Sequence, residues 1–288
     1  MTVASTDVRA VFWWRWFRRF GELGMLAKVS AGVIAVASVT AVIGGWVAPH
    51  RPTESDLARA WGGPTGSHLL GSDFTGGDML SRLLAGARSA MLGPLVVVVL
   101  AVACGVSIAI ATAWLGGRFD STVGAALDVV FAFPAILLAI LAATVFGVGV
   151  NAAVIALSIA YTPYIARVVR GAALQERAKA YIAALEVQGM SARSICARHL
   201  VPNVMPIVVA QATTLFGYAM VDLAAISFIG LGVQRPHPDW GLMVNENLGG
   251  IIQGHPWPSA VSGLCLVVVV VAFNLLGERL GDLADGSR

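Results

Sequence analysis

The sequence has little charge and almost no lysine. Of its 288 residues only 12% are Asp, Glu, Lys or Arg, against roughly 25% in soluble domains. The two lysines are Lys28 and Lys179, and each follows Ala instead of Gly, so the phosphate-binding motif G-x-x-x-x-G-K-[ST] is absent. The chain therefore cannot hydrolyse ATP through such a loop, and energy from ATP would have to come from another chain.

Residues that hold metals or act as nucleophiles are also sparse. The three cysteines (Cys104, Cys196 and Cys265) lie far apart, and we expect small buried residues instead of a disulfide framework. The sequence contains neither a His-Glu-x-x-His zinc motif nor a G-x-S-x-G nucleophile elbow. The five histidines are scattered along the chain. The sequence thus predicts no catalytic residue, no metal site and no cofactor on this chain.

What the sequence has in abundance is apolar residues, which make up 57% of the chain. A helix needs about 17–25 residues to cross a bilayer, and six apolar stretches are long enough. They cover residues 29–48, 89–115, 123–146, 152–169, 208–231 and 259–276. We therefore predict an all-α, polytopic membrane protein with six transmembrane helices in one domain, residues 29–285.

Basic residues predict which ends of the spans face the cytoplasm, because cytoplasmic loops collect Lys and Arg. With six spans, both termini share a side with residue 118 and with segment 167–205, and this side carries 14 of the 19 basic residues. The other side contains segments 49–88 and 233–258. Both termini are therefore predicted to be cytoplasmic, and the net charge of +3 needs no nucleic acid to explain it. Within the N-terminal segment 1–28, the Trp- and Arg-rich stretch 11–20 predicts an interfacial helix.

The largest charged insert in the second half of the chain is segment 170–206, between two predicted spans. Four of its apolar residues have the i, i+3, i+4, i+7 spacing of one helix face: Ala178, Tyr181, Ile182 and Leu185. Gly189 can take the left-handed conformation that ends a helix, and Ser191 can cap a second short helix. Pro202 is expected to close that second helix. The segment predicts a polar cytoplasmic hairpin that a soluble partner could contact.

Two acidic residues, Asp128 and Asp222, fall inside predicted spans. A carboxylate there costs about 2.5–3.5 kcal/mol on insertion scales unless it faces water, the bundle interior or a partner. Asp128 lies near the cytoplasmic end of its predicted span, so its carboxylate could extend to the membrane interface and avoid this cost. Asp222 lies deeper, and we weigh a pathway-lining role equally with a contact to a companion subunit. Arg167 and Arg170 are expected to anchor the end of the fourth span at lipid phosphates.

Several segments resemble the membrane subunits of bacterial binding-protein-dependent ABC importers. Segment 170–206 resembles their EAA loop, with Ala183-Ala184-Leu185, Gly189 and His199-Leu200-Val201-Pro202 in the matching places, although Ala183 replaces the usual Glu. Three further segments resemble the oligopeptide/dipeptide/nickel branch: HLLGSDFTGGDMLSRLLAGAR (68–88), DVVFAFPAILLAIL (128–141) and DLAAISFIGLGVQRPHPDWG (222–241). The resemblance covers most of residues 65–285 and implies the type I importer permease fold.

The resemblance also implies roles and partners. The partners would be a second permease subunit, two ATPase subunits that bind ATP and Mg²⁺, an external substrate-binding protein and a peptide, within a bacterial inner membrane. Coupling to the ATPases would involve Tyr181, Ala183, Ala184, Leu185, Gly189, Ser191, Arg198, His199 and Pro202. The translocation pathway or a subunit contact would involve Asp128, Asp222, Ser227 and Phe228.

Three other functions stay open on the sequence alone. The substrate could be nickel or another small solute of the same family. The chain could be a proton-coupled secondary transporter that uses Asp128 and Asp222, although the internal repeats common in such transporters are not visible. It could also be a membrane scaffold without transport activity.

Overall fold

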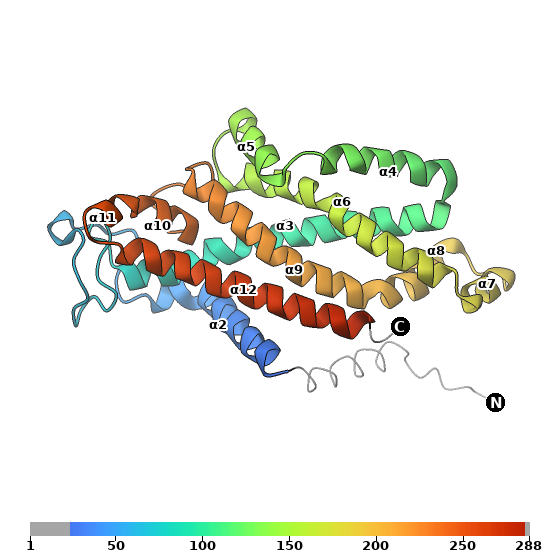
Figure 1. Cartoon of the computed structure of the whole chain (residues 1–288), viewed down its shortest axis with the longest axis horizontal. Helices are drawn as coiled ribbons and strands as arrows, with labels where there is room; N and C mark the ends of the chain where they lie inside the picture. Colours follow the sequence, from blue (N-terminus) through green and yellow to red (C-terminus); the bar gives the residue numbers. More distant parts are fainter. Residues whose placement is uncertain (1–23, 286–288) are drawn as a thin grey trace.

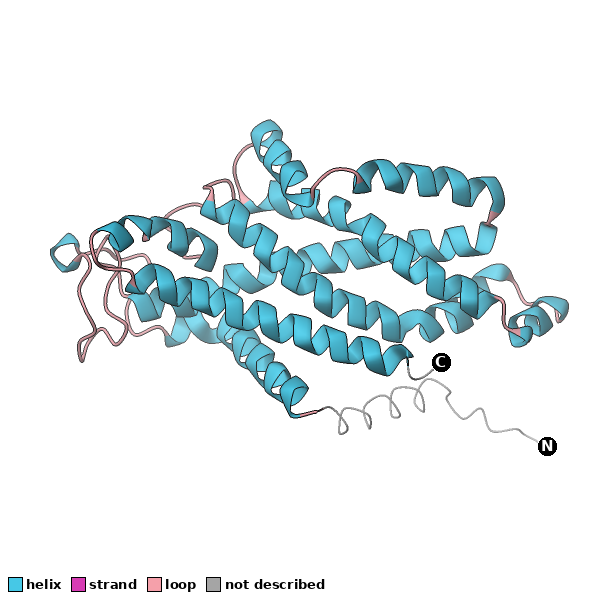
Figure 2. Cartoon of the chain, in the orientation of Figure 1, coloured by secondary structure: helices cyan, strands magenta, loops and turns pink. Residues whose placement is uncertain are grey.

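The computed structural model describes residues 24–285, and this part of the chain is helical, with a single isolated bridge between Ser72 and Asp78 (Figure 2). The predicted interfacial helix at 11–20 lies outside the described residues. The long helices are α2 (Met25–Val47), α3 (Met79–Leu115), α4 (Gly117–Phe131), α5 (Ala135–Phe146), α6 (Val150–Arg177), α9 (Val201–Phe228) and α12 (Trp257–Asp285). The short ones are η2 (Leu57–Arg59), α7 (Ala180–Val187), α8 (Ala192–Ile195), η3 (Cys196–Leu200), α10 (Trp240–Glu246) and α11 (Leu248–Ile252).

Five continuous helical stretches of the described chain are long and apolar enough to cross a bilayer: 25–47, 79–115, 150–177, 192–228 and 257–284. The bent pair of α4 and α5 makes a sixth span if it is counted as one. The side chains that these helices turn outward are largely apolar, as in Val36, Val99 and Leu264. Such a surface suits lipid, and helices satisfy their own backbone groups there. The polytopic all-α prediction is confirmed.

The third predicted span, 123–146, is not one straight helix. It is broken after α4 and bends by 78° into α5. Pro134 explains the break, because a proline has no N–H to donate and disfavours helical geometry at the residue before it, Phe133. Pro134 is itself the N-cap of α5. After the bend, α5 lies beside α6 (Figure 1), and its residues Ala139 and Ala143 are buried against the bundle.

The core of the bundle forms where α3 packs on α6 and where α9 packs on α12. The second contact is close because glycine faces the partner helix twice. A Cβ atom at Gly277 would come within 2.3 Å of Thr214 Oγ1, and one at Gly217 within 2.9 Å of Asn274 Nδ2. Small residues of this kind let membrane helices approach closely, which increases their van der Waals contact.

The bundle has two distinct ends. Helix α7, the start of α2 and the end of α12 lie toward one end, whereas α10 and α11 lie at the opposite end (Figure 1). Segment 48–78 joins α10 and α11 there, since Phe74 N–H donates to Asn247 Oδ1 at 3.3 Å. We call these two regions the α7 end and the α10 end.

Candidate functional site

The hairpin at the α7 end has the turn that the sequence predicts. Gly189 has φ +77°, a conformation that side chains other than glycine rarely adopt. The N–H of Met190 donates to the carbonyl of Leu185 at 3.1 Å, which closes the end of α7. Ser191 then caps α8, because its Oγ accepts from the N–H of Ser194 at 3.4 Å. The helix, glycine turn and capped second helix are confirmed.

Pro202, however, does not close the second helix. The chain runs on from α8 through η3, which is one turn of π-helix, into α9, so that residues 192–228 form one continuous stretch. In a regular α-helix the Pro202 ring would clash with the carbonyl of Arg198. The wider π turn, in which Val201 N–H donates to the Cys196 carbonyl, accommodates the ring. The prediction for Pro202 is wrong for this reason.

Four polar side chains attach the hairpin to the bundle. Tyr181 Oη donates to Glu176 Oε1 at 2.6 Å, and Asn203 Nδ2 donates to the same oxygen at 2.9 Å. Lys179 Nζ lies 2.8 Å from Glu176 Oε2. Burial and the bond to Glu176 raise the pKa of Tyr181 to about 12, so its hydroxyl stays a donor at neutral pH. We call these four residues the Glu176 cluster. It links α6, α7 and α9, and it fixes α7 relative to two spans.

The outward face of the hairpin is small and apolar. Ala183 and Ala184 are exposed on α7, and Val187 on the same helix is 89% exposed. Ile182 points the other way and is fully buried. Of the remaining predicted coupling residues, Gly189, Ser191 and Arg198 are exposed, and Leu185, His199 and Pro202 are partly buried. The small side chains at positions 183, 184 and 187 let a partner approach the backbone of α7 closely there, beside the exposed Glu186.

The intramembrane acids have partners within this chain. Tyr161 Oη on α6 donates to Asp222 Oδ2 on α9 at 2.7 Å. Asp128 on α4 pairs with Arg167 on α6, and both side chains are well exposed, at 68% and 46%. Arg167 also lies over the Phe131 ring, 4.6 Å from its centroid.

The second arginine of this region, Arg170, is also paired within the chain. Its Nε donates to Asp120 Oδ1 at 2.6 Å, and its Nη2 bonds Asp120 Oδ2. Anchoring of Arg167 and Arg170 at lipid phosphates stays a prediction, and the structure adds a carboxylate partner for each. Both guanidinium groups are already paired with carboxylates of α4, which tie that helix to α6.

Ser227 and Phe228 lie at the end of α9. Ser227 is buried, and its Oγ accepts from the N–H of Val233 at 3.3 Å, so it stabilises the turn that leaves the helix. Phe228 is partly buried. At this turn Asp239 caps α10, because its Oδ1 accepts from the N–H groups of Gly241 and Leu242, both at 3.1 Å.

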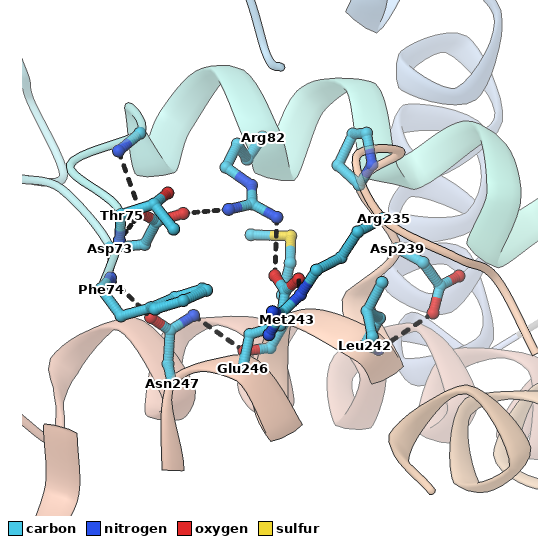
Figure 3. A network of polar contacts seen from close by, with 12 residues as sticks. Asp73, Phe74, Thr75, Arg82, Arg235, Asp239, Leu242, Met243, Glu246 and Asn247 are labelled. Carbon is cyan, nitrogen blue, oxygen red and sulfur yellow. Dashed lines mark hydrogen bonds and ion pairs between the residues drawn. The ribbon is translucent and has the colours of Figure 1, made fainter. Parts of the chain in front are cut away.

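An ionic network built on three buried side chains and the exposed Arg235 joins the segments of the α10 end (Figure 3). Arg82 on α3 pairs with Asp73 through Nη1, and its Nη2 lies 2.7 Å from Glu246 Oε2 on α10. Arg235 Nε donates to the other oxygen of Glu246 at 2.6 Å. The side chains of Asp73 and Glu246 are at most 1% exposed. We call these four residues the Arg82 network. Sequence reasoning missed Glu246, which lies 164 positions from Arg82.

Comparisons with known proteins identify the family of this chain. The family described as "Binding-protein-dependent transport system inner membrane component" matches residues 101–286 of this chain. The chain belongs to this family. It is a permease subunit of an ABC importer and a multi-pass membrane protein. Subunits of this kind work with another permease subunit, ATPase subunits and a binding protein.

Named relatives match the permease over most of its length. The dipeptide transport system permease protein DppC of Alkalihalophilus pseudofirmus is 30% identical over 94% of this chain and 89% of its own. A putative peptide transport system permease of Brucella suis is 33% identical over 90% of this chain and 86% of its own. The glutathione transport system permease GsiD of Escherichia coli is 33% identical over 99% of this chain and 94% of its own.

A solved structure matches the fold of the permease. A chain of the inward-facing MetNI methionine ABC transporter has a TM-score of 0.58 and 20% identity, and the match covers 72% of this chain and 97% of that chain. The likeness confirms the type I importer permease fold.

The Arg82 network generates a prediction about stability. Glu246→Ala would leave a buried Arg82 with one carboxylate, and Arg235 with none. Removing one partner of a buried ion pair typically costs about 3–5 kcal/mol. We expect a clearly lower Tm for the purified permease complex, measured by thermal unfolding. Asp282→Ala is the control, because it breaks an exposed pair with Arg279 that is worth about 0–1 kcal/mol. Equal Tm values for the two variants would contradict a structural role of the network.

Proposed function

We propose that this permease forms half of the translocation pathway of a bacterial peptide importer. The observation that carries the proposal is the near full-length match to relatives named for transport of dipeptide, peptide and glutathione. Their substrates share a peptide backbone with a free amino and carboxyl group. Peptide is therefore the substrate class, and nickel or another small solute is the second candidate.

The proposed arrangement has two permease subunits, two ATPase subunits and an external binding protein in the inner membrane. ATP and Mg²⁺ would bind to the ATPases. Binding protein would deliver peptide at the α10 end, and closure of the ATPases around ATP would move the hairpins at the α7 end. Rigid tilting of packed helices would then open the pathway to each side in turn.

The hairpin face of Ala183, Ala184 and Val187 is the proposed contact with an ATPase. Its small exposed side chains suit a helix lying in a groove of a partner. The Glu176 cluster and the continuous stretch 192–228 would carry a displacement of α7 into the bundle. Tyr181, Leu185, Gly189 and Ser191 would shape the hairpin from within. Arg198, His199 and Pro202 would form the joint between the hairpin and α9.

A proton-coupled secondary transporter is less well supported. Asp128 is exposed and its charge is neutralised by Arg167 on the neighbouring helix. This ion pair between α4 and α6 suits a structural role for Asp128. Asp222 is then the remaining candidate for carrying a proton. Its hydrogen bond from the Tyr161 hydroxyl is equally consistent with a fixed polar contact between α6 and α9. We therefore place Asp222 in the pathway or at a subunit contact, with Asp128 holding α4.

The topology can be tested with introduced cysteines. In a background without the three native cysteines, Val187→Cys should resist an impermeant thiol reagent added to intact cells, because α7 would be cytoplasmic. Thr65→Cys, which is exposed at the α10 end, should react. After lysis both positions should react. Labelling of position 187 from outside would contradict cytoplasmic termini and a cytoplasmic hairpin.

The proposed role of Asp222 can be tested by removing its charge. Asp222→Leu should lower peptide uptake at least tenfold while membrane insertion is intact or improved, because the costly carboxylate is gone. Tyr161→Phe, which removes only the hydroxyl, is the control and should keep most of the uptake. Copurification of the companion permease subunit separates the two roles, because a subunit contact would be lost and a pathway residue would not affect yield. Normal uptake and normal yield in Asp222→Leu would show that the acid is incidental.

The coupling role of the hairpin is tested by Gly189→Val and Ala184→Arg. The first strains a backbone at φ +77°, and the second puts a long side chain on the exposed face. Both should abolish the ATPase activity that binding protein and peptide stimulate in reconstituted vesicles, at unchanged permease abundance. Gly116→Val is the matched control, because Gly116 has φ +61°, has open space around it and lies outside the hairpin. Full stimulation in both hairpin variants would contradict coupling through α7.

A further inference from the structure

Two histidines and one aspartate that lie apart in the sequence meet at the α10 end. His50 follows α2, His68 lies in the loop before α3, and Asp78 is the N-cap of α3. Among the described residues, 24–285, they are the group of His, Cys, Asp or Glu side chains whose ligand atoms converge, all within 4.8 Å of one another. They lie outside the Arg82 network, the hairpin and the Asp222 contact, so none of the contacts described above uses them.

The distances between the ligand atoms suit a small metal ion. His68 Nδ1 lies 2.9 Å from Asp78 Oδ1, and His50 Nδ1 lies 3.6 Å from Asp78 Oδ2. The two imidazole rings stack with centroids 4.4 Å apart, so both rings present the same edge to the carboxylate. Tetrahedral zinc with bonds of about 2.0–2.2 Å to nitrogen and oxygen places neighbouring ligand atoms roughly 3.3–3.6 Å apart. The cluster therefore needs only small shifts to surround an ion.

One atom of the cluster lacks a partner. His50 Nδ1 is buried and makes no hydrogen bond, although buried polar atoms are nearly always satisfied. The rest of the ring is accessible, since the His50 side chain is 38% exposed. A lone pair on this nitrogen would face the Asp78 carboxylate with nothing between them. A cation bound to both groups would satisfy it.

Ser81 orients two of the three ligands. Its N–H and its Oγ both donate to Asp78 Oδ2, at 2.8 and 2.6 Å. The same Oγ accepts from the backbone N–H of His50 at 2.9 Å. Groups that hold ligands in this way typically change metal affinity by about 10–100-fold when they are removed. These hydrogen bonds hold the Asp78 carboxylate and the backbone of His50 in place for metal binding.

The third ligand, His68, has a competing contact that can be displaced. Arg59 Nη1 lies 2.8 Å from His68 Nε2. A guanidinium group only donates, so Nε2 accepts and the ring proton is on Nδ1, directed at Asp78. Metal binding at Nδ1 would move this proton to Nε2 and turn Arg59 away. Arg59 is free to turn, because its side chain is 58% exposed and has a second partner in Asp56, 3.2 Å away.

We propose that His50, His68 and Asp78 bind one divalent transition-metal ion, of the class of Zn²⁺, with water completing the coordination. Two imidazoles and one carboxylate suit Zn²⁺, Ni²⁺ or Co²⁺, whereas Mg²⁺ and Ca²⁺ prefer an all-oxygen set. The ion joins the end of α2 to the start of α3. Its role is structural: it holds these two helix ends together on the external face, whichever solute the importer carries.

The test uses Co²⁺ as a spectroscopic probe on the intact transporter, purified with its companion subunits and without a histidine tag, after treatment with EDTA. The wild-type complex should bind one more Co²⁺ ion per complex than the variant His50→Gln, with visible d–d absorption that Zn²⁺ abolishes. Zn²⁺ should also raise the Tm of the wild type and not of the variant. His50→Gln is chosen because it leaves the Asp78 cap and the core untouched.

His237→Gln is the matched control, because His237 is an exposed histidine at the same end and outside the cluster. It should keep the wild-type stoichiometry and affinity, while His50→Gln weakens Co²⁺ binding at this site at least tenfold. Equal Co²⁺ binding by wild type and His50→Gln would overturn the proposal. So would an equal loss of binding in the two histidine variants, which would indicate unspecific surface binding.

Discussion

The α10 end of this permease depends on one buried guanidinium group. Arg82 is buried and charged, so losing either of its carboxylates destabilises the fold, because an uncompensated buried ion costs several kcal/mol. One carboxylate comes from the segment before α3 and the other from α10, in the second half of the chain. Neither segment can therefore take its place without the other. The connections of α3, α9 and α12 are fixed relative to one another as a result.

The ion pairs along α4, unlike those of Arg82, are exposed and weak. Asp120–Arg170 and Asp128–Arg167 are partly or largely exposed, and pairs of this kind contribute about 0–1 kcal/mol each. No residue of α4 is buried, and the helix bends sharply into α5. The polar contacts of α4 can thus break at low cost, whereas α5 is held on α6 by the buried residues Ala139 and Ala143. The molecule thus combines an α10 end held by buried charges with a helix, α4, that is held mainly by exposed ion pairs.

Turns and helix caps of this structure could be predicted from the sequence, because they depend on neighbouring residues. Contacts between distant residues could not. Gly189 and Ser191 were predictable because a positive φ and an N-cap depend on one residue and its neighbours. The two prolines show the limit of such rules: Pro134 breaks its helix, whereas Pro202 is absorbed by a π turn that no local pattern announces. The contacts between Arg82 and Glu246, or between His50 and Asp78, join distant positions. Only the packing of the whole bundle brings these side chains together.

The absorbed proline has a mechanical consequence. Because the π turn keeps residues 192–228 continuous, the second arm of the hairpin and the span that carries Asp222 form one rod, about 55 Å long at 1.5 Å per residue. If this rod tilts by about 10° about its contact with α12 at residues 214–217, the end at residue 192 moves by roughly 6 Å and the end at Phe228 by roughly 3 Å, in opposite directions. A displacement of the chain at Ser191 then moves the other end of the helix, beside Phe228, in the opposite direction. The helix would act as a lever whose fulcrum is its close contact with α12 at Gly217 and Gly277.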